Sequence, residues 1–285
     1  MAASGLKWMR VGPQAELIFT RAPDGRTFIS QQRVGYPFHI TRPFYLDSVP
    51  AGMLTLYLQS VSGGIYRGER LALSLEAEAH AEAQVTTQSA TIVHRMKDGG
   101  EAHQEMIIRA GAGALLEYLP DPLILFPGAR FHTKLRVMAE PSATVIVCDA
   151  FTQHDANSAG GRFERLASET RIERPDGSLL ALDRFDIGGT LDEAHFAGAG
   201  STYPAHGTVM VVNNSCPAEE LANALREAFS ECGGIYAGAS TMPHECGAWA
   251  RILAADGHAL RAALKAAWTA ARWKISGAEP AHRPK

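Results

Sequence analysis

Apolar and polar residues alternate along much of the chain with the two-residue period of half-buried β-strands. In the clearest stretch, one side would carry Phe131, Thr133, Leu135 and Val137 and the other His132, Lys134 and Arg136. The segments 15–20 and 26–33 also resemble strands and flank Pro23-Asp24-Gly25, a turn typical of hairpins. The pattern therefore predicts a mainly β protein.

Three segments share one plan: an apolar strand, a corner of small residues and a second apolar strand. They are Leu75–Val85, Ile107–Leu116 and Leu135–Val147. Alignment on Ala83, Ala114 and Ala143 spaces them about 30 residues apart. Near-regular steps predict stacked β-coils or a β-sandwich of similar hairpins, although an all-β chain can show such spacing by chance.

The last quarter of the chain changes to the period of helices. An apolar stripe over 217–232 predicts one helix, capped by Ser215 or Cys216 and ended by Gly233-Gly234. A second stripe, from Leu260 to Ala271, predicts a helix with Asp256 as its N-cap. Between them, 235–239 and 248–253 are strand candidates.

We therefore expect a single domain over 1–285. A β-helix-like body of stacked β-sheets would extend to about residue 213, and a small α+β portion with two helices would occupy about 214–276. Residues 280–285 are predicted to be a frayed tail.

Charge and composition restrict the classes of function that the protein can have. The chain has 285 residues, 46% of them hydrophobic and 20% charged, with a formal net charge of -3. Without a basic excess, a general nucleic-acid binder or a membrane-surface anchor is disfavoured. The N-terminus carries no signal-type apolar region, and the four cysteines form no CxxC pair. These features predict a cytoplasmic protein with reduced thiols.

Common catalytic signatures are missing. The chain has neither a P-loop nor a GxSxG elbow, and Gly111-Ala112-Gly113 lacks the third glycine of a dinucleotide turn. These absences disfavour an enzyme, so no catalytic residue is assigned. Convergent sites leave no motif, so a motif-poor, β-rich hydrolase remains an alternative.

One segment suggests metal chemistry. His244-Glu245-Cys246 places three potential ligands in a row. In an extended chain, His244 and Cys246 would point the same way and share a weakly bound metal. The alternative is a solvated loop followed by a thiol at the start of a strand.

The most distinctive segment combines prolines with large apolar residues over 116–131. We predict an extended, turn-rich ribbon instead of a central strand or a helix, because proline cannot donate to a ladder. Its apolar side chains would be buried or docked on a partner. The residues expected to dock are Tyr118, Leu119, Pro120, Asp121, Pro122, Leu123 and Phe126.

At this ribbon the sequence resembles the UreD (UreH) family of urease accessory proteins, whose segment is LEWLPDPLIPFAGARF-like. Further resemblances follow in the family's order. They are Arg42-Pro43-Phe44-Tyr45, the Gly-rich turn and strand start 63–71, Thr86-Thr87-Gln88-Ser89-Ala90-Thr91, Tyr236-Ala237-Gly238-Ala239-Ser240, and Ala250-Arg251-Ile252-Leu253 with Trp268 and Arg272. Several long motifs in order are a specific signal.

Three positions depart from the family pattern. The family's aspartate is Glu69, its Val-Gly pair is Tyr66-Arg67, and its TKxYR stretch has Ile92 in place of lysine. These changes suggest a divergent paralogue. A β interaction module without any urease role is thus another alternative.

The resemblance implies a non-enzymatic maturation factor that binds urease apoprotein and UreF, and through UreF the GTPase UreG. It implies nickel delivery to the urease active site through an internal polar channel. No tightly bound cofactor is expected, and nickel would bind transiently. Our candidates for the channel lining are Glu69, Thr91 and Asp183, with surface ion pairs as the alternative for Glu69 and Asp183.

Overall fold

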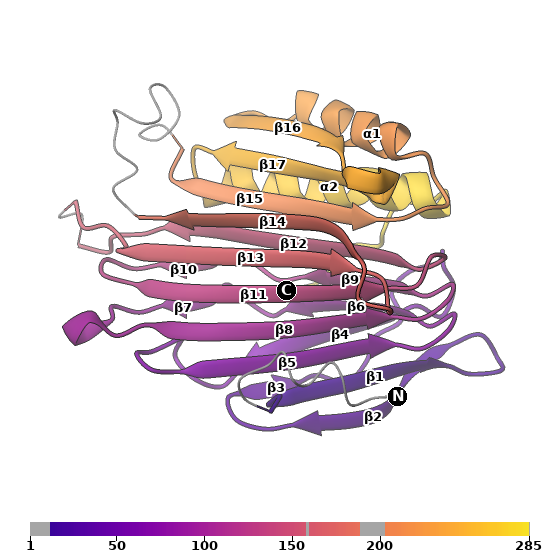
Figure 1. Ribbon diagram of the computed structural model, residues 1–285, viewed down its shortest axis with the longest axis horizontal. Helices are drawn as coiled ribbons and strands as arrows, with labels where there is room; N and C mark the ends of the chain where they lie inside the picture. The colour runs from indigo at the N-terminus through magenta and orange to yellow at the C-terminus, as the bar shows by residue number, and fades with distance from the viewer. Residues whose placement is uncertain (1–11, 158–159, 189–202, 285) are drawn as a thin grey trace.

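Two β-sheets face each other in the computed structural model, which describes residues 12–157, 160–188 and 203–284 (Figure 1). The seven-stranded sheet, called sheet A, has the order β14 (Leu179–Ile187), β13 (Arg165–Glu173), β11 (Arg130–Ala139), β8 (Ala102–Ala110), β5 (Arg70–Ala77), β1 (Ala15–Arg21) and β2 (Thr27–Val34).

The ten-stranded sheet is called sheet B; in Figure 1 part of it lies behind sheet A and its C-terminal strands extend above β14. Its order is β16 (Ile235–Thr241), β17 (Gly247–Ala254), β15 (Ala205–Val212), β12 (Thr144–Gln153), β9 (Leu115–Leu119), β6 (Glu82–Thr87), β4 (Leu54–Ser60) and β3 (Phe38–Ile40). Two short strands, β10 (Leu123–Leu125) and β7 (Ile92–Val93), extend it from β12.

The body is a stack of β-coils, as the repeat predicted. The pairs β5–β6, β8–β9 and β11–β12 each cross from sheet A to sheet B, and successive coils pair in parallel. The register differs from the sequence alignment: Ala83 pairs with Leu116, which places Ala81 beside Ala114. A two-residue shift keeps the same side chains inward, so hydrophobic periodicity alone does not distinguish these registers.

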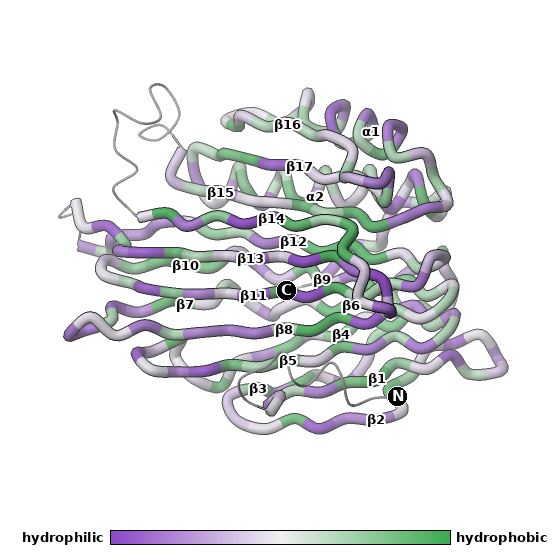
Figure 2. Tube along the Cα trace, viewed as in Figure 1, coloured by the Kyte–Doolittle hydropathy of each residue, from purple (hydrophilic) through white to green (hydrophobic). Residues whose placement is uncertain are grey.

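The hydrophobic core lies between the sheets. In Figure 2, hydrophobic and hydrophilic residues mix along single strands, as expected for strands with one buried face. The largest cluster joins Leu17 and Phe19 of β1 to Leu56 of β4 and Val85 of β6. A second cluster around Phe131 and Leu125 fills the opposite end of the strands.

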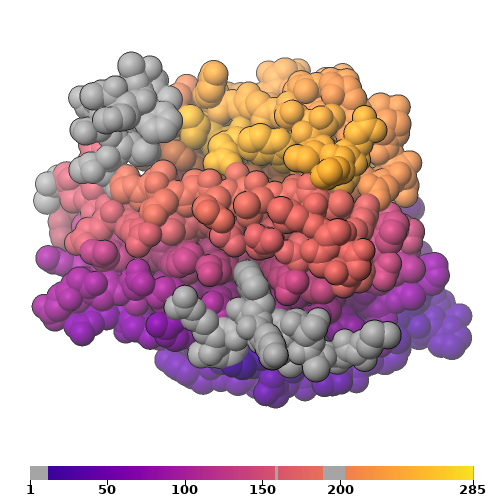
Figure 3. All heavy atoms as spheres, in the orientation of Figure 1, coloured from indigo at the N-terminus to yellow at the C-terminus, as the bar shows by residue number. Residues whose placement is uncertain are grey.

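The C-terminal portion continues sheet B without a break, because β15 pairs with both β12 and β17. Helices α1 (Ala218–Ser230) and α2 (Gly257–Ser276) pack against this part of the sheet. In Figure 3 it forms the orange-to-yellow layer on top of the coils. Neither helix within the described ranges combines the length and apolarity needed to cross a membrane.

The helix caps were predicted correctly at only one helix. The Asp256 carboxylate accepts from the Ala259 N–H at 2.8 Å and caps α2 as expected. The cap predicted for α1 was wrong: Pro217 holds the N-cap position and no side chain caps it. Ser215 and Cys216 instead donate their backbone N–H groups to the Asn213 side chain.

The prediction of a frayed C-terminal tail was also wrong for the described residues up to 284. The Arg283 guanidinium lies 2.6 Å from the Asp47 carboxylate and donates to Gln84. The Ala281 N–H donates to Asp47, and the Pro284 carbonyl accepts from the Tyr57 hydroxyl. The tail is therefore fixed against the coils by charged contacts that no hydrophobic pattern reveals.

Candidate functional site

A row of polar side chains crosses the inner face of sheet A, the face turned towards sheet B, perpendicular to the strands. The ladder aligns Gln104 of β8 with Thr133 of β11 and Ser168 of β13. The neighbouring row on one side contains Phe131 and Leu166, both buried apolar residues. Since strand side chains alternate between faces, this polar row points between the sheets, where an ordinary core would be apolar.

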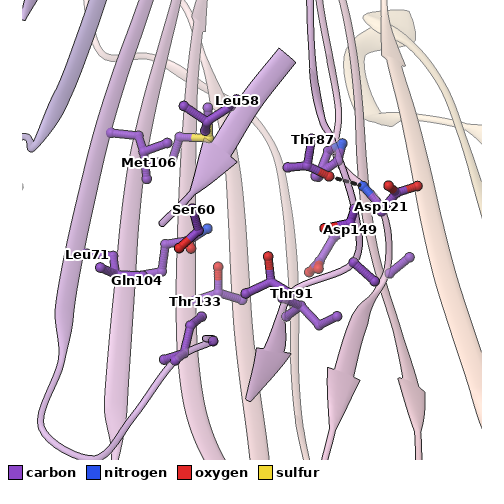
Figure 4. A pocket seen from close by; sticks show the side chains of 18 of the residues that line it. Leu58, Ser60, Leu71, Thr87, Thr91, Gln104, Met106, Asp121, Thr133 and Asp149 are labelled. Atoms are coloured by element: carbon purple, nitrogen blue, oxygen red, sulfur yellow. Dashed lines mark hydrogen bonds between the residues drawn. The ribbon is translucent and has the colours of Figure 1, made fainter. Parts of the chain in front are cut away.

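The polar row lines an interior cavity of about 320 Å³. Gln104, Thr133, Thr91 and Asp149 face the same space in Figure 4. The other polar lining residues are Gln59, Ser60, Ser62, Thr87, Gln88, Ser89, Asp121, Ser168 and Thr170. A polar cavity of this size accommodates ordered water. Among the described residues, its lining is rich in neutral oxygen groups and carries only two carboxylates, those of Asp121 and Asp149.

Asp149 is the carboxylate that sheet B contributes to this cavity. It lies on β12, and its Oδ2 accepts a hydrogen bond from the Ser168 hydroxyl of the opposite sheet at 2.6 Å. Burial raises the pKa of Asp149, an effect that the Ser168 hydrogen bond partly opposes. This carboxyl group therefore gives up its proton less readily than a surface aspartate does.

A second hollow of about 550 Å³ opens where sheet A ends at β14 and sheet B continues. Its lining is largely apolar and aromatic: Phe151, Phe185, Ile187, His206, Gly207, Thr208, Tyr236, Gly238, Ala239, Ser240, Trp249, Arg251 and Leu253 join Asp149. Of the described residues, Asp149 alone lines both spaces. Among the described residues, the two hollows therefore share one ionisable lining side chain.

An ion pair bridges the two sheets at the second hollow. The Arg251 guanidinium of β17 lies 2.6 Å from the Asp183 carboxylate of β14. The ladder aligns Asp183 with Thr170, so its side chain faces the interior of sheet A. Both charges act on the nearby Asp149: Asp183 raises its pKa and Arg251 lowers it.

The three channel candidates from the sequence lie in different places. Thr91 lines the cavity. Asp183 lies beside the second hollow and pairs with Arg251, whereas its alternative partners Arg184 and Arg171 pair with Glu169 and Glu173. Glu69 lies outside the cavity lining, and its carboxylate accepts from the Tyr66 N–H at 2.9 Å across a tight turn. The structure thus groups Thr91 with Asp149 and separates Glu69 from them.

The proposed docking ribbon is integrated into the fold. Contrary to the prediction, its first part is a central strand: β9 lies between β6 and β12 in sheet B. The prolines follow this strand, so its ladder stays intact. Tyr118 and Pro122 are buried, and the others among its seven docking candidates are only partly exposed. The ribbon therefore supports the cavity wall, to which Tyr118, Pro120, Asp121 and Leu123 belong.

The expected geometry of His244 and Cys246 is wrong. Residues 243–245 form a 3-10 turn in which His244 has a φ of 58°, so the chain is not extended there. His244 is exposed, whereas Cys246 is fully buried in the core between the sheets. Within the described ranges, no cluster of three or more His, Cys, Asp or Glu side chains is arranged to hold a metal ion.

The Tyr66-Arg67 departure from the family pattern lies outside the cavity lining, and both side chains contact defined partners. Tyr66 stacks on the imidazole of His94 with ring centroids 4.4 Å apart, and His94 faces the Gly63 carbonyl that lines the cavity. Arg67 pairs with Asp98 at 3.0 Å. The larger side chains are therefore accommodated at the surface without filling the cavity.

Sequence reasoning missed Asp149 although a signal exists. It interrupts the apolar run Val145–Phe151 with a charge, the same criterion that selected Asp183. The criterion alone does not separate a cavity-lining carboxylate from a structural one. Glu117, which interrupts Leu115–Leu119, instead accepts from Trp268 and Arg272 on the outer face of sheet B.

Comparison with known proteins agrees with the motif resemblance. A sequence profile described as "UreD urease accessory protein" matches residues 12–285. A urease accessory protein UreD of Pseudomonas syringae pv. tomato is 41% identical over 95% of both chains. A urease accessory protein UreD of Pseudomonas syringae pv. syringae is 39% identical over 95% of both chains. One of a Bradyrhizobium strain is 38% identical over 92% of this chain and 91% of the relative.

Proposed function

Because the chain belongs to the UreD family of urease accessory proteins and serves urease maturation, we propose that its interior is a path for nickel. The observation that carries this proposal is the polar row Gln104–Thr133–Ser168 leading to Asp149, which lines both hollows. The row runs across the coils, so it provides polar groups at successive strands along the axis of the stack.

The chemistry of the lining suits transit better than storage. A divalent cation leaving water needs oxygen or nitrogen lone pairs at short intervals, together with residual water. A complete, tight site would stop it, whereas several incomplete sites let it enter and leave. Hydroxyl and amide oxygens of Thr91, Gln104 and Thr133 are weak ligands of this kind.

Asp149 supplies a strong electrostatic attraction for a cation where the two hollows share their lining. A buried carboxylate is costly when it is charged and alone, which is why burial raises the pKa of this group. A dication beside Asp149 would compensate the buried negative charge. The cation binds the ionised carboxylate, so it stays only while the proton of Asp149 is displaced. Asp183 pairs with the nearby Arg251 at 2.6 Å, so this guanidinium competes less with an arriving cation for Asp149.

We further propose that the protein acts in a complex, joining urease apoprotein to UreF and, through UreF, to UreG. Each end of the path would open against one of these partners, so that nickel crosses between proteins without release into bulk water. No step in this function makes or breaks a covalent bond of a substrate. Nickel is cargo here and not a resident cofactor.

The decisive experiment compares two isosteric variants during urease activation in cells. Asp149→Asn removes the carboxylate that lines both hollows and keeps its volume. Asp186→Asn is the matched control, because Asp186 lies on sheet A but pairs with Arg165 at the surface. We expect Asp149→Asn to lower the nickel content and activity of purified urease at least ~10-fold, with Asp186→Asn unchanged.

Co-purification separates transport from assembly. Both variants should still co-purify with urease subunits and UreF, since Asp149 faces the interior cavity. Normal nickel content in urease matured by Asp149→Asn would contradict the path. A variant that no longer assembles would show instead that Asp149 supports the fold, and Ser168→Ala, which removes only the hydroxyl, then provides the test.

A further inference from the structure

Two histidines lie side by side on the outer face of sheet A. The parallel ladder of β8 and β11 pairs His103 directly with His132, and their ring centroids are 5.5 Å apart. Both alternate with inward-pointing cavity residues, Gln104 and Thr133, so the imidazoles lie on the opposite side of the sheet from the cavity. Both rings are partly exposed.

The spacing suits one metal ion between the rings. Metal–imidazole nitrogen bonds are ~2.0–2.1 Å, so an ion held by two imidazoles lies roughly 3 Å from each ring centre and keeps the centres within about 6 Å. The strands fix this spacing, because directly paired residues cannot separate without breaking the ladder. Among the ring contacts of the described residues, this is the one histidine pair.

A carboxylate already orients one of the two rings. Nε2 of His103 lies 3.0 Å from the Glu101 carboxylate. If Nε2 donates its proton there, Nδ1 retains the lone pair that a metal requires, which is the arrangement found around metal-binding histidines. His132 forms no hydrogen bond within the described ranges, so its ring nitrogens are not committed to another side chain.

Nearby cations are largely balanced by carboxylates. Arg165 forms a two-bond pair with Asp186, at 2.9 and 2.7 Å, and lies 3.9 Å from Glu101. The ladder places Lys134 between Glu105 of β8 and Glu169 of β13. The repulsion that a bound dication would meet is therefore reduced.

We propose that His103 and His132 together bind a borderline divalent metal ion, of the Ni²⁺, Cu²⁺ or Zn²⁺ class, on the outer face of sheet A. Two imidazoles provide a partial coordination sphere that water completes, so the site exchanges its ion readily. It is separate from the interior path, and its existence does not depend on nickel transit through the cavity.

The test titrates Cu²⁺ and Ni²⁺ into the purified full-length protein. Cu²⁺ should bind more tightly than Ni²⁺, in the usual order for nitrogen ligands. Electron paramagnetic resonance of the first Cu²⁺ equivalent should show hyperfine coupling to two nitrogens in the wild type. Coupling to one nitrogen or none would overturn the proposal without any variant.

Variants then assign the site. His103→Asn and His132→Asn should each abolish the two-nitrogen signal and weaken binding of that equivalent at least ~10-fold, and Glu101→Gln should weaken it ~10-fold through loss of ring orientation. His258→Asn, an exposed histidine on α2, is the matched control. Retention of wild-type binding by both pair variants would refute the site. Circular dichroism confirms that each variant is folded.

Discussion

Nη2 of Arg272 lies 2.6 Å from Oε2 of Glu117, and both side chains are fully buried. The Arg272 Nε donates to Oε1 of the same carboxylate at 2.7 Å. Trp268 and Gln84 also donate to Glu117, at 3.0 and 2.9 Å. This contact joins α2, the last helix, to β9 at the centre of sheet B. The paired Trp268 and Arg272 of the C-terminal motif are therefore structural partners of Glu117.

Removing the arginine should destabilise the fold strongly. Although burial opposes its charge, Glu117 and Asp47 raise the pKa of Arg272. Arg272→Met would leave the Glu117 carboxylate buried without its cation, and we expect a loss of ~3–5 kcal/mol in the free energy of unfolding. Chemical denaturation measures it. The control Arg33→Met removes the exposed partner of Glu16 and should cost less than ~1 kcal/mol.

The C-terminal tail should contribute measurably to stability. Arg283 is the second cation that approaches Asp47, at 2.6 Å, and its side chain is 8% exposed. We expect Arg283→Gln to lower the free energy of unfolding by ~1.5–3 kcal/mol, the range for a charged hydrogen bond. Denaturation and limited proteolysis of the full chain measure the effect. Unchanged stability and protease resistance would show that the tail is not fixed in solution.

The pH dependence of stability should reveal Asp149. Its pKa is raised by burial, so the folded state keeps the proton to higher pH than the unfolded chain. Its contribution to the free energy of unfolding therefore falls as pH rises from ~3.9 through the raised pKa. Asp149→Asn should gain stability relative to wild type across this window, at about 1.4 kcal/mol per pH unit, and level off above it.

That experiment also separates function from stability. We expect the Asp149→Asn protein to be at least as stable as wild type at neutral pH while urease activation falls. A variant whose stability difference from wild type does not change with pH would contradict the burial of this carboxylate. Asp186→Asn serves again as the control, because its carboxylate is exposed and paired with Arg165.

Asp183 should matter through Arg251. Asp183→Asn removes the carboxylate 2.6 Å from the guanidinium and leaves a positive charge beside Asp149. We expect lower urease activation, because the freed cation would compete with nickel for Asp149. The double variant Asp183→Asn/Arg251→Gln should recover part of the activity. If the double variant activates urease less than Asp183→Asn does, the electrostatic explanation is wrong.

Glu69 allows a direct comparison of two sequence-based candidates. Its carboxylate accepts the Tyr66 N–H within a turn and lies outside the cavity lining. From the sequence, Glu69→Ala and Asp183→Ala together are expected to reduce activation without preventing assembly. On geometric grounds, Asp183 should account for most of that loss. Urease nickel content for each single variant decides between them.

Local signals in the sequence determined the strands and helices. The alternation over 131–137 correctly separates the inward residues from His132 and Lys134, because a strand has only two faces. Asp256 identifies the start of α2 because its carboxylate bonds a backbone N–H only three residues away. The stacking of coils followed from the repeat, since each coil buries its apolar strands only against its neighbours.

Only the tertiary structure decided which polar residues meet. Gln104, Thr133, Ser168 and Asp149 are far apart in sequence, and their proximity depends on a ladder register that a two-residue shift would change without altering the hydrophobic pattern. The same holds for Glu117 and Arg272, separated by 155 residues. Periodicity records which face a side chain takes, whereas a cavity or a buried ion pair depends on what the opposite layer brings to it.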